Sequence, residues 1–362
     1  MSTALFSPIK IGRHTLNHRV ILAPLTRFRA TEDGVPTEIQ AEYYQQRASE
    51  GGLLITEATF ITDRAGGIPY IPGIYSQKQI EGWKKVTRAV HEKKAVIYLQ
   101  LWHIGRAAFS KNNPNQEQVV SASDVPIEGP SWFGEAHEVP RPLTIDEIQG
   151  LIQEFRQAVV NAIEAGFDGV EIQCGGGFII DQFINSGSNK RTDNYGGSVE
   201  NRTRLALEII DTITDAVGAD RIGVRLSPGS TFGGMQDEDV VATTSYLVSR
   251  IQERHPDLAY LHFIEPRADV HMSDEATTND TLEPFRKIWK GPLITASGFS
   301  TAREYAFEFA EKTGSMIAFG RAFIANPDLP QRLLNGSELN KYDRSTFYTR
   351  GPKGFIDYPF LK

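Results

Sequence analysis

Short apolar runs recur along the chain, and each is followed by a longer segment in which apolar and polar residues alternate at helical spacing. Brief runs rich in β-branched residues predict buried strands, and apolar residues at steps of three and four predict helices. The predicted strands are Val20–Ala23, Leu53–Glu57, Ala95–Leu101, Gly169–Gln173, Ile222–Leu226, Tyr260–Ile264, Leu293–Ala296 and Ser315–Phe319.

The clearest helical pattern is TIDEIQGLIQEFRQAVVNAIEAG, residues 144–166. Thr144 is a residue type that caps helix N-termini, and Gly166 stands where a C-terminal glycine is expected. Helical segments of this kind separate the predicted strands, so the chain alternates between strand and helix.

This alternation predicts an α/β fold, a single (β/α)8 TIM barrel domain that spans residues 1–362. A doubly wound sheet is the alternative, but it favours a glycine-rich turn after its first strand, where this chain has LAPLTRFRA. The segment SPIKIGRHTLNHRV predicts an N-terminal hairpin that turns at Gly12-Arg13 and covers the barrel's bottom. A long irregular stretch after the third strand, Gly105–Pro142, is expected over the active face.

Composition and charge narrow the class of partner. The net charge of −7 and the pI near 5.7 argue against nucleic acid or an anionic membrane as the main partner. A single cysteine and an opening segment without a long apolar core favour a reducing, cytoplasmic setting. We therefore expect a soluble monomer or homodimer that acts on a small molecule.

The candidate site follows from the fold, because barrel active sites lie at or just beyond the C-terminal ends of the strands. Arginine, amide and hydroxyl groups gather there, without a carboxylate pair, a metal-ligand cluster or a nucleophile–base pair. Glycosidase, metallohydrolase and triad chemistry are therefore disfavoured. The residues at these ends are Pro24, Leu25, Thr26, Ala58, Gln100, Trp102, Gln173 to Phe178, Arg225, Glu265, Arg267, Ser297, Gly298, Phe299, Gly320 and Arg321.

Three features of this set have two interpretations each. The loops ASGFS and FGRAF either bind a phosphate through backbone N–H groups and Arg321 or merely turn the chain into its helices. Arg225 faces either an anionic ligand or a buried acid. Gln100 pairs either with the edge of a heterocycle or with neighbouring backbone.

Taken together, these residues resemble the Old Yellow Enzyme family, FMN-dependent ene-reductases built on a (β/α)8 barrel. The C-terminal KYDRSTFYTRGPKGFIDYPF looks most like the fungal branch, with the yeast enzymes and the ergot-pathway chanoclavine-aldehyde reductase. The matching segments run in family order along almost the whole chain: LAPLTRFRA, EYYQQRAS, LLITEAT, LQLWHIGRAA, AGFDGVEI, DQFINSGSNKRTDNYGGSVENRTRL, GVRLSP, FGRAFIANPDLPQRL and KYDRSTFY.

The resemblance implies FMN as cofactor, NADPH as reductant, and a role for each matching position. Thr26 would hydrogen-bond near the flavin C4 oxygen, Gln100 would pair with the pyrimidine edge, and Arg225 would lie at the N1 side. Trp102 and Tyr348 would line the substrate pocket. The other implied cofactor positions are Pro24, Leu25, Ala58, Ser297, Gly298, Phe299, Gly320 and Arg321.

The chain departs from the family in VEIQCGGGFIIDQF, residues 170–183. The family has His-x-x-Asn or His-x-x-His there, followed by a tyrosine two residues on. Those positions, which bind the substrate oxygen and protonate Cα, are Gln173, Gly176 and Phe178 in this chain. Loss of one oxyanion donor costs roughly 2.7–4 kcal/mol and loss of a general acid about 10²–10⁴ in rate. Thr26, Gln173 and Phe178 are thus the catalytic positions of a site that lacks the standard acid.

Three hypotheses follow. In the first, the enzyme acts on a bulky or unusually polarised substrate, such as a fungal secondary metabolite, by reduction, dehydrogenation or redox-neutral isomerisation, with Gly176 providing room. In the second, it is an NADPH-dependent ene-reductase whose acid has moved to Tyr70, His137 or His271. In the third, it binds FMN without turnover.

Two neighbouring features have plainer interpretations. A lone thiol such as Cys174 at a strand end is expected to fill space rather than react. The three consecutive glycines lack the lysine and the spacing of a phosphate-binding loop, so we interpret them as lost side chains.

Overall fold

The computed structural model describes residues 3–131, 134–265, 281–296, 298–300 and 303–361. Within these residues, eight parallel strands close into a ring in which each strand pairs with the next and β13 pairs with β3. The strands of the ring are β3 (Val20–Leu22), β4 (Leu53–Ile55), β6 (Val96–Trp102), β9 (Gly169–Gln173), β10 (Ile222–Leu226), β11 (Tyr260–Ile264), β12 (Leu293–Ala296) and β13 (Met316–Phe319).

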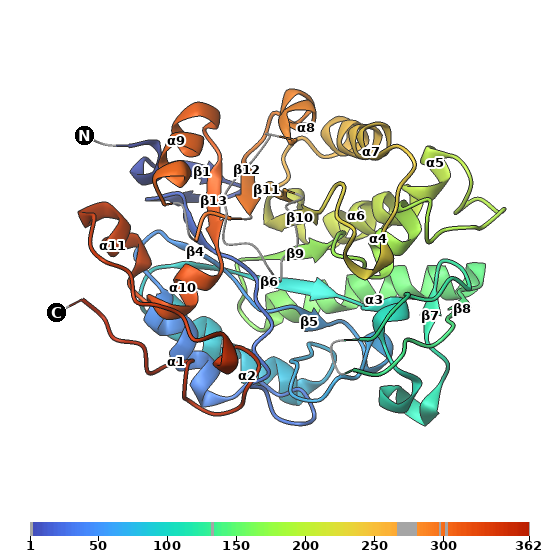
Figure 1. Cartoon of the computed structure of the whole chain (residues 1–362), viewed down its shortest axis with the longest axis horizontal. Coiled ribbons are helices and arrows are strands. Elements are labelled where there is room, and N and C mark those ends of the chain that lie inside the picture. Colours follow the sequence, from blue (N-terminus) through green and yellow to red (C-terminus); the bar gives the residue numbers. More distant parts are fainter. Residues whose placement is uncertain (1–2, 132–133, 266–280, 297, 301–302, 362) are drawn as a thin grey trace.

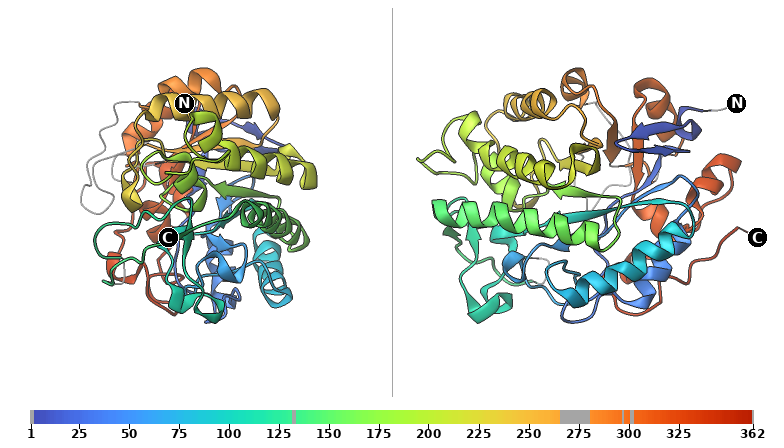
Figure 2. Two further views of the ribbon diagram at one scale, coloured as in Figure 1. Left: turned by 90° about the vertical axis from the view of Figure 1, so that its right-hand side faces the viewer. Right: turned by 180° about the vertical axis from the view of Figure 1, so that it is seen from behind.

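Helices lie outside the ring and cover it on all sides (Figure 1), and the two further views show the same arrangement (Figure 2). The (β/α)8 barrel predicted from the alternation of patterns is therefore confirmed. The helices are α1 (Glu38–Arg47), α2 (Gln77–His91), α3 (Ile145–Glu164), α4 (Ile179–Ile184), α5 (Val199–Arg202), α6 (Arg204–Val217), α7 (Val240–Arg254), α8 (Glu283–Ile288), α9 (Arg303–Thr313), α10 (Arg321–Ala325) and α11 (Leu329–Asn335).

Local sequence signals set the ends of α3. The Thr144 side chain accepts a hydrogen bond from the Glu147 N–H, and the Glu147 carboxylate accepts one from the Thr144 N–H at 2.8 Å. This reciprocal pair satisfies two N–H groups that a helix start leaves without partners. Gly166 follows the helix with φ of +88°, a conformation that glycine adopts without strain.

Three predicted strands are longer than the observed ones. β3 ends at Leu22 rather than Ala23, and β13 begins at Met316 rather than Ser315. β4 ends at Ile55 rather than Glu57, because the Glu57 N–H donates to the Tyr44 hydroxyl at 2.8 Å instead of continuing the sheet. Three further strands have only two residues each, which is too short for the sequence pattern to predict them. They are β5 (Thr59–Phe60), β7 (Val120–Ser121) and β8 (Arg141–Pro142).

The N-terminal hairpin closes the bottom of the barrel, as predicted. β1 (Ile9–Ile11) and β2 (His14–Leu16) pair antiparallel around Gly12, whose φ is +47°. Ile11 and Leu16 are fully buried against the residues that fill the barrel interior. Arg13 forms an ion pair of 2.8 Å with Asp220, which precedes β10, so the hairpin lies at the N-terminal ends of the strands.

The barrel interior changes in character along its axis. Its lower part holds the Tyr98 and Tyr260 rings, whose centroids are 5.5 Å apart. Gly169 and Gly223 make room for them, since a Cβ at either position would lie within 2.5 Å of a tyrosine ring. The interior positions further along the strands are polar, and the C-terminal ends of the strands carry the candidate site.

The irregular stretch Gly105–Pro142 lies at the end of the molecule toward which β6 and β9 run (Figure 1). It contains short 3-10 turns and the β7–β8 pair. Among the described residues, no helix is long and apolar enough to cross a membrane. The part of the chain that the structure describes also holds no group of three or more His, Cys, Asp or Glu residues placed to bind a metal ion.

Candidate functional site

Three buried polar atoms without partners lie at the C-terminal ends of neighbouring strands. Gln173, the last residue of β9, pairs in register with Arg225 of β10, and Trp102 ends β6. Gln173 Oε1, Arg225 Nε and Trp102 Nε1 are buried and have no hydrogen-bond partner among the described residues. Buried polar groups in proteins are nearly always hydrogen-bonded, so three together indicate a binding site for a polar ligand.

The turn after β9 satisfies its backbone donors from within the protein. The Gly176 N–H donates to Ser227 Oγ at 2.7 Å, and the Gly177 N–H donates to Asp181 Oδ2 at 2.8 Å. Two consecutive glycines with positive φ resemble a backbone anion site, but here both N–H groups are occupied. The turn therefore supplies no free backbone donor at these two residues to replace the missing oxyanion pair.

The interpretation of these glycines as lost side chains is wrong for two of the three. A Cβ at Gly175 would lie 2.6 Å from Ser227 Oγ, and one at Gly177 would lie 2.7 Å from the Phe232 carbonyl oxygen. Gly177 also has φ of +73°, which most side chains avoid. Packing and backbone conformation therefore require glycine at both positions, whatever the chemistry of the site.

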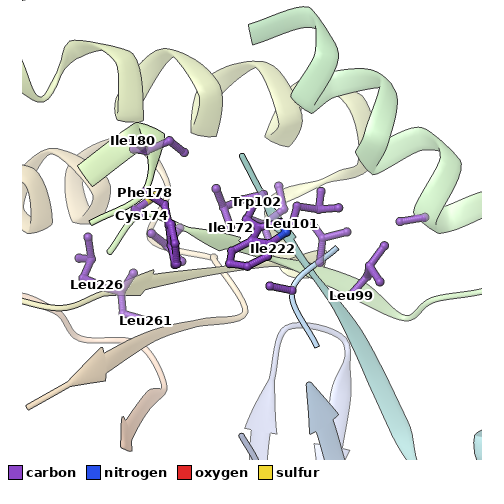
Figure 3. Packing of buried hydrophobic residues seen from close by; sticks show 14 of the residues in the cluster. Leu99, Leu101, Trp102, Ile172, Cys174, Phe178, Ile180, Ile222, Leu226 and Leu261 are labelled. Atoms are coloured by element: carbon purple, nitrogen blue, oxygen red, sulfur yellow. The ribbon is translucent and has the colours of Figure 1, made fainter. Parts of the chain in front are cut away.

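The three positions at which the chain departs from the resemblance lie side by side. A Cβ at Gly176 would be 3.1 Å from Cε2 of Phe178 and 3.3 Å from Nε2 of Gln173. The expectation that Gly176 opens room is thus only partly met, because the Phe178 ring occupies the nearest space. Phe178 packs edge-on against Trp102, with ring centroids 4.7 Å apart, and Figure 3 shows both within the apolar cluster.

A cavity of about 380 Å³ opens beside this turn and confirms the expected position of the long stretch after β6. Phe178, Gly176 and Gly177 line it together with residues of the long stretch. The remaining lining is mostly apolar or glycine: Ile68, Ile104, Ala107, Phe109, Ile127, Glu128, Pro130, Ser131, His137, Thr231, Phe232, Gly233 and Gly234. The cavity therefore suits a sizeable molecule that has both apolar and polar surface.

His137 is the one candidate for a relocated acid that lines the cavity among those the structure describes. Its ring stacks on Phe109, and its Nδ1 is buried without a partner in the described part of the chain. Burial and the nearby Arg106 lower its pKa, so the ring is neutral at pH 7. Tyr70 instead lies under the Arg350 guanidinium, 3.4 Å from its ring centroid, and His271 falls outside the described residues.

The loops after β3 and β4 carry one set of the expected cofactor positions. Pro24 is buried, while Leu25 and the Thr26 side chain are half-buried, and Thr26 makes no hydrogen bond with the described residues. Leu25 lies against Gly320, where an added Cβ would be 3.4 Å from Leu25 Cδ2. Ala58 is buried in the loop after β4.

Gln100 and Arg225 each face a buried acid that the sequence did not reveal. Gln100 Nε2 donates to Glu171 Oε1 at 2.7 Å, so neither earlier interpretation of Gln100 included its actual partner. The charge of Glu171 also acts on Arg225, whose pKa burial lowers. A buried acid is thus near Arg225, as one interpretation expected, while its Nε lacks a partner among the described residues, as the ligand interpretation requires.

The two loops expected to bind a phosphate are described in part. Ser297 and Arg267 lie outside the described residues. Gly298 has φ of +73°, and the Phe299 ring is buried and stacks on Tyr305. Gly320 precedes α10, and the Arg321 guanidinium lies 5.9 Å from the Tyr342 ring centroid.

Tyr348 does not line the cavity. Its side chain is 64% exposed and contacts Phe28 edge-on, with centroids 6.0 Å apart. Cys174, by contrast, is buried in the apolar cluster (Figure 3). Burial raises the pKa of its thiol far above its usual range, which agrees with a space-filling role.

Comparisons with known proteins agree with this arrangement. A model of the NADH:flavin oxidoreductase / NADH oxidase family matches residues 4–340. 12-oxophytodienoate reductase 1 of Oryza sativa subsp. japonica is 46% identical over 359 residues, 99% of this chain and 93% of that protein. Probable inactive dehydrogenase easA of Claviceps fusiformis is 44% identical over 373 residues, 100% and 96% of the two chains. The structure of morphinone reductase in complex with tetrahydroNAD is similar, with a TM-score of 0.90, 42% identity, and coverage of 99% and 98%.

Proposed function

Because the chain belongs to the Old Yellow Enzyme family of FMN-dependent oxidoreductases, we propose that it uses FMN and NADPH on a bulky small molecule with an activated C=C bond. The reaction is a reduction, a dehydrogenation or a redox-neutral isomerisation that needs no acid from the turn after β9. One observation carries this proposal: Gln173, Gly176 and Phe178 lie side by side at the turn that lines the cavity, and none of them has an ionisable group.

The residues at the mouth of the barrel fit a flavin. Arg225 Nε is buried without a described partner, and a charged donor of this kind suits the side of the ring where negative charge collects on reduction. Thr26 lies in the loop after β3 and makes no hydrogen bond with the described residues, and Ala58 is small enough to lie behind a flat ring. When bound, FMN supplies hydride transfer between the nicotinamide and a substrate carbon.

The chain's residues limit what happens to the proton. Phe178 keeps the shape of a tyrosine but has no hydroxyl to protonate Cα, and the Gly176 and Gly177 N–H groups are already bonded within the protein. The Gln173 amide can donate to a substrate oxygen through its Nε2 N–H, while its buried Oε1 has no partner among the described residues. A reduction would therefore take its proton from water, and a substrate that stabilises its own negative charge is favoured.

The cavity favours a large substrate. Its volume of about 380 Å³ lies within the range of small-molecule sites, and Phe178, Phe109 and Ile104 line it with apolar surface. A fungal secondary metabolite with several rings agrees with this shape and with the similarity to easA. The cytoplasmic setting and the monomer or homodimer expected from the sequence remain part of the proposal.

The test is to purify the protein, record its visible spectrum, and follow anaerobic bleaching by NADPH. Reoxidation is then compared for oxygen, for cyclohexenone and for a more strongly polarised nitroalkene of the same ring size. We expect a yellow protein that NADPH bleaches, that oxygen and the nitroalkene reoxidise, and that cyclohexenone reoxidises at least 10²-fold more slowly than the nitroalkene. A protein that takes up no FMN would contradict the proposal, and FMN binding without any reoxidation by an alkene would indicate a binding protein.

The position of His137 supports a second candidate, an ordinary ene-reductase with a relocated proton donor. Its ring shares the cavity with Phe178, and the imidazolium form, whose pKa burial and Arg106 lower, is the one that can give a proton to Cα. Fast reoxidation by cyclohexenone that is lost in His137→Phe would favour this candidate. If His137→Phe and the parent protein reduce the nitroalkene equally fast and cyclohexenone equally slowly, the first candidate stands.

A further inference from the structure

Glu171 lies in the middle of β9 with its side chain inside the barrel, fully buried beneath the mouth. It pairs in register with Gln100 on β6, and Gln100 Nε2 donates to its Oε1 at 2.7 Å. Its other oxygen, Oε2, accepts from Nδ1 of His262 on β11 at 2.8 Å. Both carboxylate oxygens are therefore held by residues of neighbouring or facing strands.

The charges in this group are fixed by its surroundings. Burial lowers the pKa of His262, which makes its ring neutral with the proton on Nδ1, facing Glu171. Burial acts to raise the pKa of Glu171, but His262, Arg225 and Gln100 outweigh it and lower that pKa. The barrel interior thus holds a carboxylate close to the guanidinium of Arg225, which makes no hydrogen bond with the described residues.

The geometry determines how Gln100 meets a ligand. With one N–H donated to Glu171, its amide has a fixed orientation. The carbonyl oxygen and the second N–H are then left for the mouth of the barrel, one acceptor beside one donor. Without the carboxylate, the amide would be free to turn over and present the reverse order.

We propose that Glu171 is a positioning residue that orients Gln100 and offsets the positive charge of Arg225, and thereby sets the affinity and the reduction potential of bound FMN. This inference rests on the proposed function. A negative charge below Arg225 weakens the field that Arg225 exerts on a ring that becomes more negative on reduction. Removal of that charge should therefore favour the reduced cofactor.

A purely structural role for Glu171 makes a different prediction. A buried carboxylate that only held β6, β9 and β11 together would affect stability, and its loss would weaken oxidised and reduced FMN equally. The reduction potential depends on the ratio of these two affinities, so it would stay unchanged. The potential therefore distinguishes the two roles where turnover alone does not.

The experiment compares the FMN-loaded protein with Glu171→Gln and with Tyr98→Phe as a matched control. Tyr98 precedes Gln100 by two residues and fills the same interior, but it is uncharged. We measure the Kd of oxidised FMN by fluorescence quenching and the potential by reductive titration against a reference dye. Glu171→Gln should weaken oxidised FMN and raise the potential, by about 30 mV for each tenfold gain in the relative affinity for reduced FMN. Tyr98→Phe should leave the potential unchanged.

Several results would overturn the inference. An unchanged potential in a Glu171→Gln protein that still binds FMN would contradict it, and so would an equal rise in Tyr98→Phe. If Glu171→Gln does not fold, Glu171→Asp serves as the second variant. Its shorter side chain keeps the negative charge but moves the carboxylate oxygens away from Gln100 and His262. FMN should therefore bind more weakly, at a nearly unchanged reduction potential. FMN affinity equal to that of the parent protein would contradict the inference. A parent protein that binds no FMN would instead refute the proposed function.

Discussion

The two sides of the barrel mouth differ in how far the protein satisfies its own polar groups. At the turn after β9, Ser227 and Asp181 accept the hydrogen bonds of Gly176 and Gly177, while Gln173 Oε1 is buried without a partner among the described residues. On the side of Arg225, a buried charged donor lacks a partner in the described part of the chain. Unsatisfied buried groups cost free energy unless a ligand completes them. The comparison agrees with the proposed function, in which FMN binding is kept and the turn after β9 supplies no acid.

The largest expected effect comes from restoring the turn. The triple variant Gln173→His, Gly176→Asn and Phe178→Tyr should raise turnover of a simple cyclic enone by at least 10³-fold, because it returns an oxyanion pair and a general acid. Asparagine is the replacement that best tolerates the φ of +69° at position 176. Steady-state kinetics with cyclohexenone and NADPH would measure the gain.

The three changes should not act additively. A side chain at position 176 contacts both Phe178 and Gln173, so Gly176→Asn alone must push the Phe178 ring aside. We expect that single variant to lose stability by about 1–3 kcal/mol without a gain in rate. If the triple variant shows no gain while it folds and binds FMN, the cavity itself, and not these residues, blocks the enone.

The next largest effect tests the other side of the comparison. Arg225→Leu should weaken FMN binding by roughly 10- to 100-fold, because a hydrogen bond to a charged group contributes about 1.5–3 kcal/mol. Titration of the apoprotein with FMN, followed by fluorescence quenching, measures this loss. Phe178→Leu is the control, since it alters the turn after β9 and should leave FMN affinity within about twofold. Equal losses in both variants would show that the two sides are not independent.

How much of the fold and of the candidate site the sequence predicts depends on how far apart in sequence the interacting residues are. Strand positions follow from local runs such as Gly169–Gln173, and β9 has those bounds in the structure. The partnership of Glu171 with Gln100 and His262 joins three strands separated by long stretches of sequence, and each of these residues looks ordinary in its own segment. The requirement for glycine at position 177 depends likewise on the Phe232 carbonyl of another loop. Local sequence patterns do not predict contacts between segments that are distant in sequence.

A smaller effect on stability is expected from Asp181, whose carboxylate accepts the hydrogen bond of the Gly177 N–H in the turn after β9. Burial raises the pKa of its carboxyl to about 7, and Asp237 acts in the same direction while Arg106 opposes it. Because the folded-state pKa lies above the unfolded one, the stability that this group contributes is present at low pH and is lost as the pH rises from about 4 to about 7. Asp181→Asn has no such titration, so its free energy of unfolding should rise relative to the parent protein between pH 5 and pH 8, by roughly 1–3 kcal/mol.

Urea unfolding at both pH values measures this difference. Asp215→Asn is a suitable control, because Asp215 is exposed on α6 and does not hold the Gly177 N–H. The free energy of the parent protein relative to Asp181→Asn should fall with rising pH, while the control should follow the parent. A parallel pH dependence of parent and Asp181→Asn would show that the Asp181 carboxyl stays ionised throughout.

The smallest effect is expected from Cys174, which directly follows Gln173 on the chain but takes no part in either side of the mouth. Its backbone N–H donates to the Arg225 carbonyl at 2.9 Å, and its thiol is buried with a strongly raised pKa. Cys174→Ala should cost about 1 kcal/mol of stability through lost packing and leave FMN affinity and turnover unchanged. Native protein should resist alkylation by iodoacetamide until it unfolds. Rapid labelling of the folded protein, or a change in FMN affinity in Cys174→Ala, would contradict this expectation. Either result would mean that the thiol contacts the cofactor-binding side of the barrel mouth.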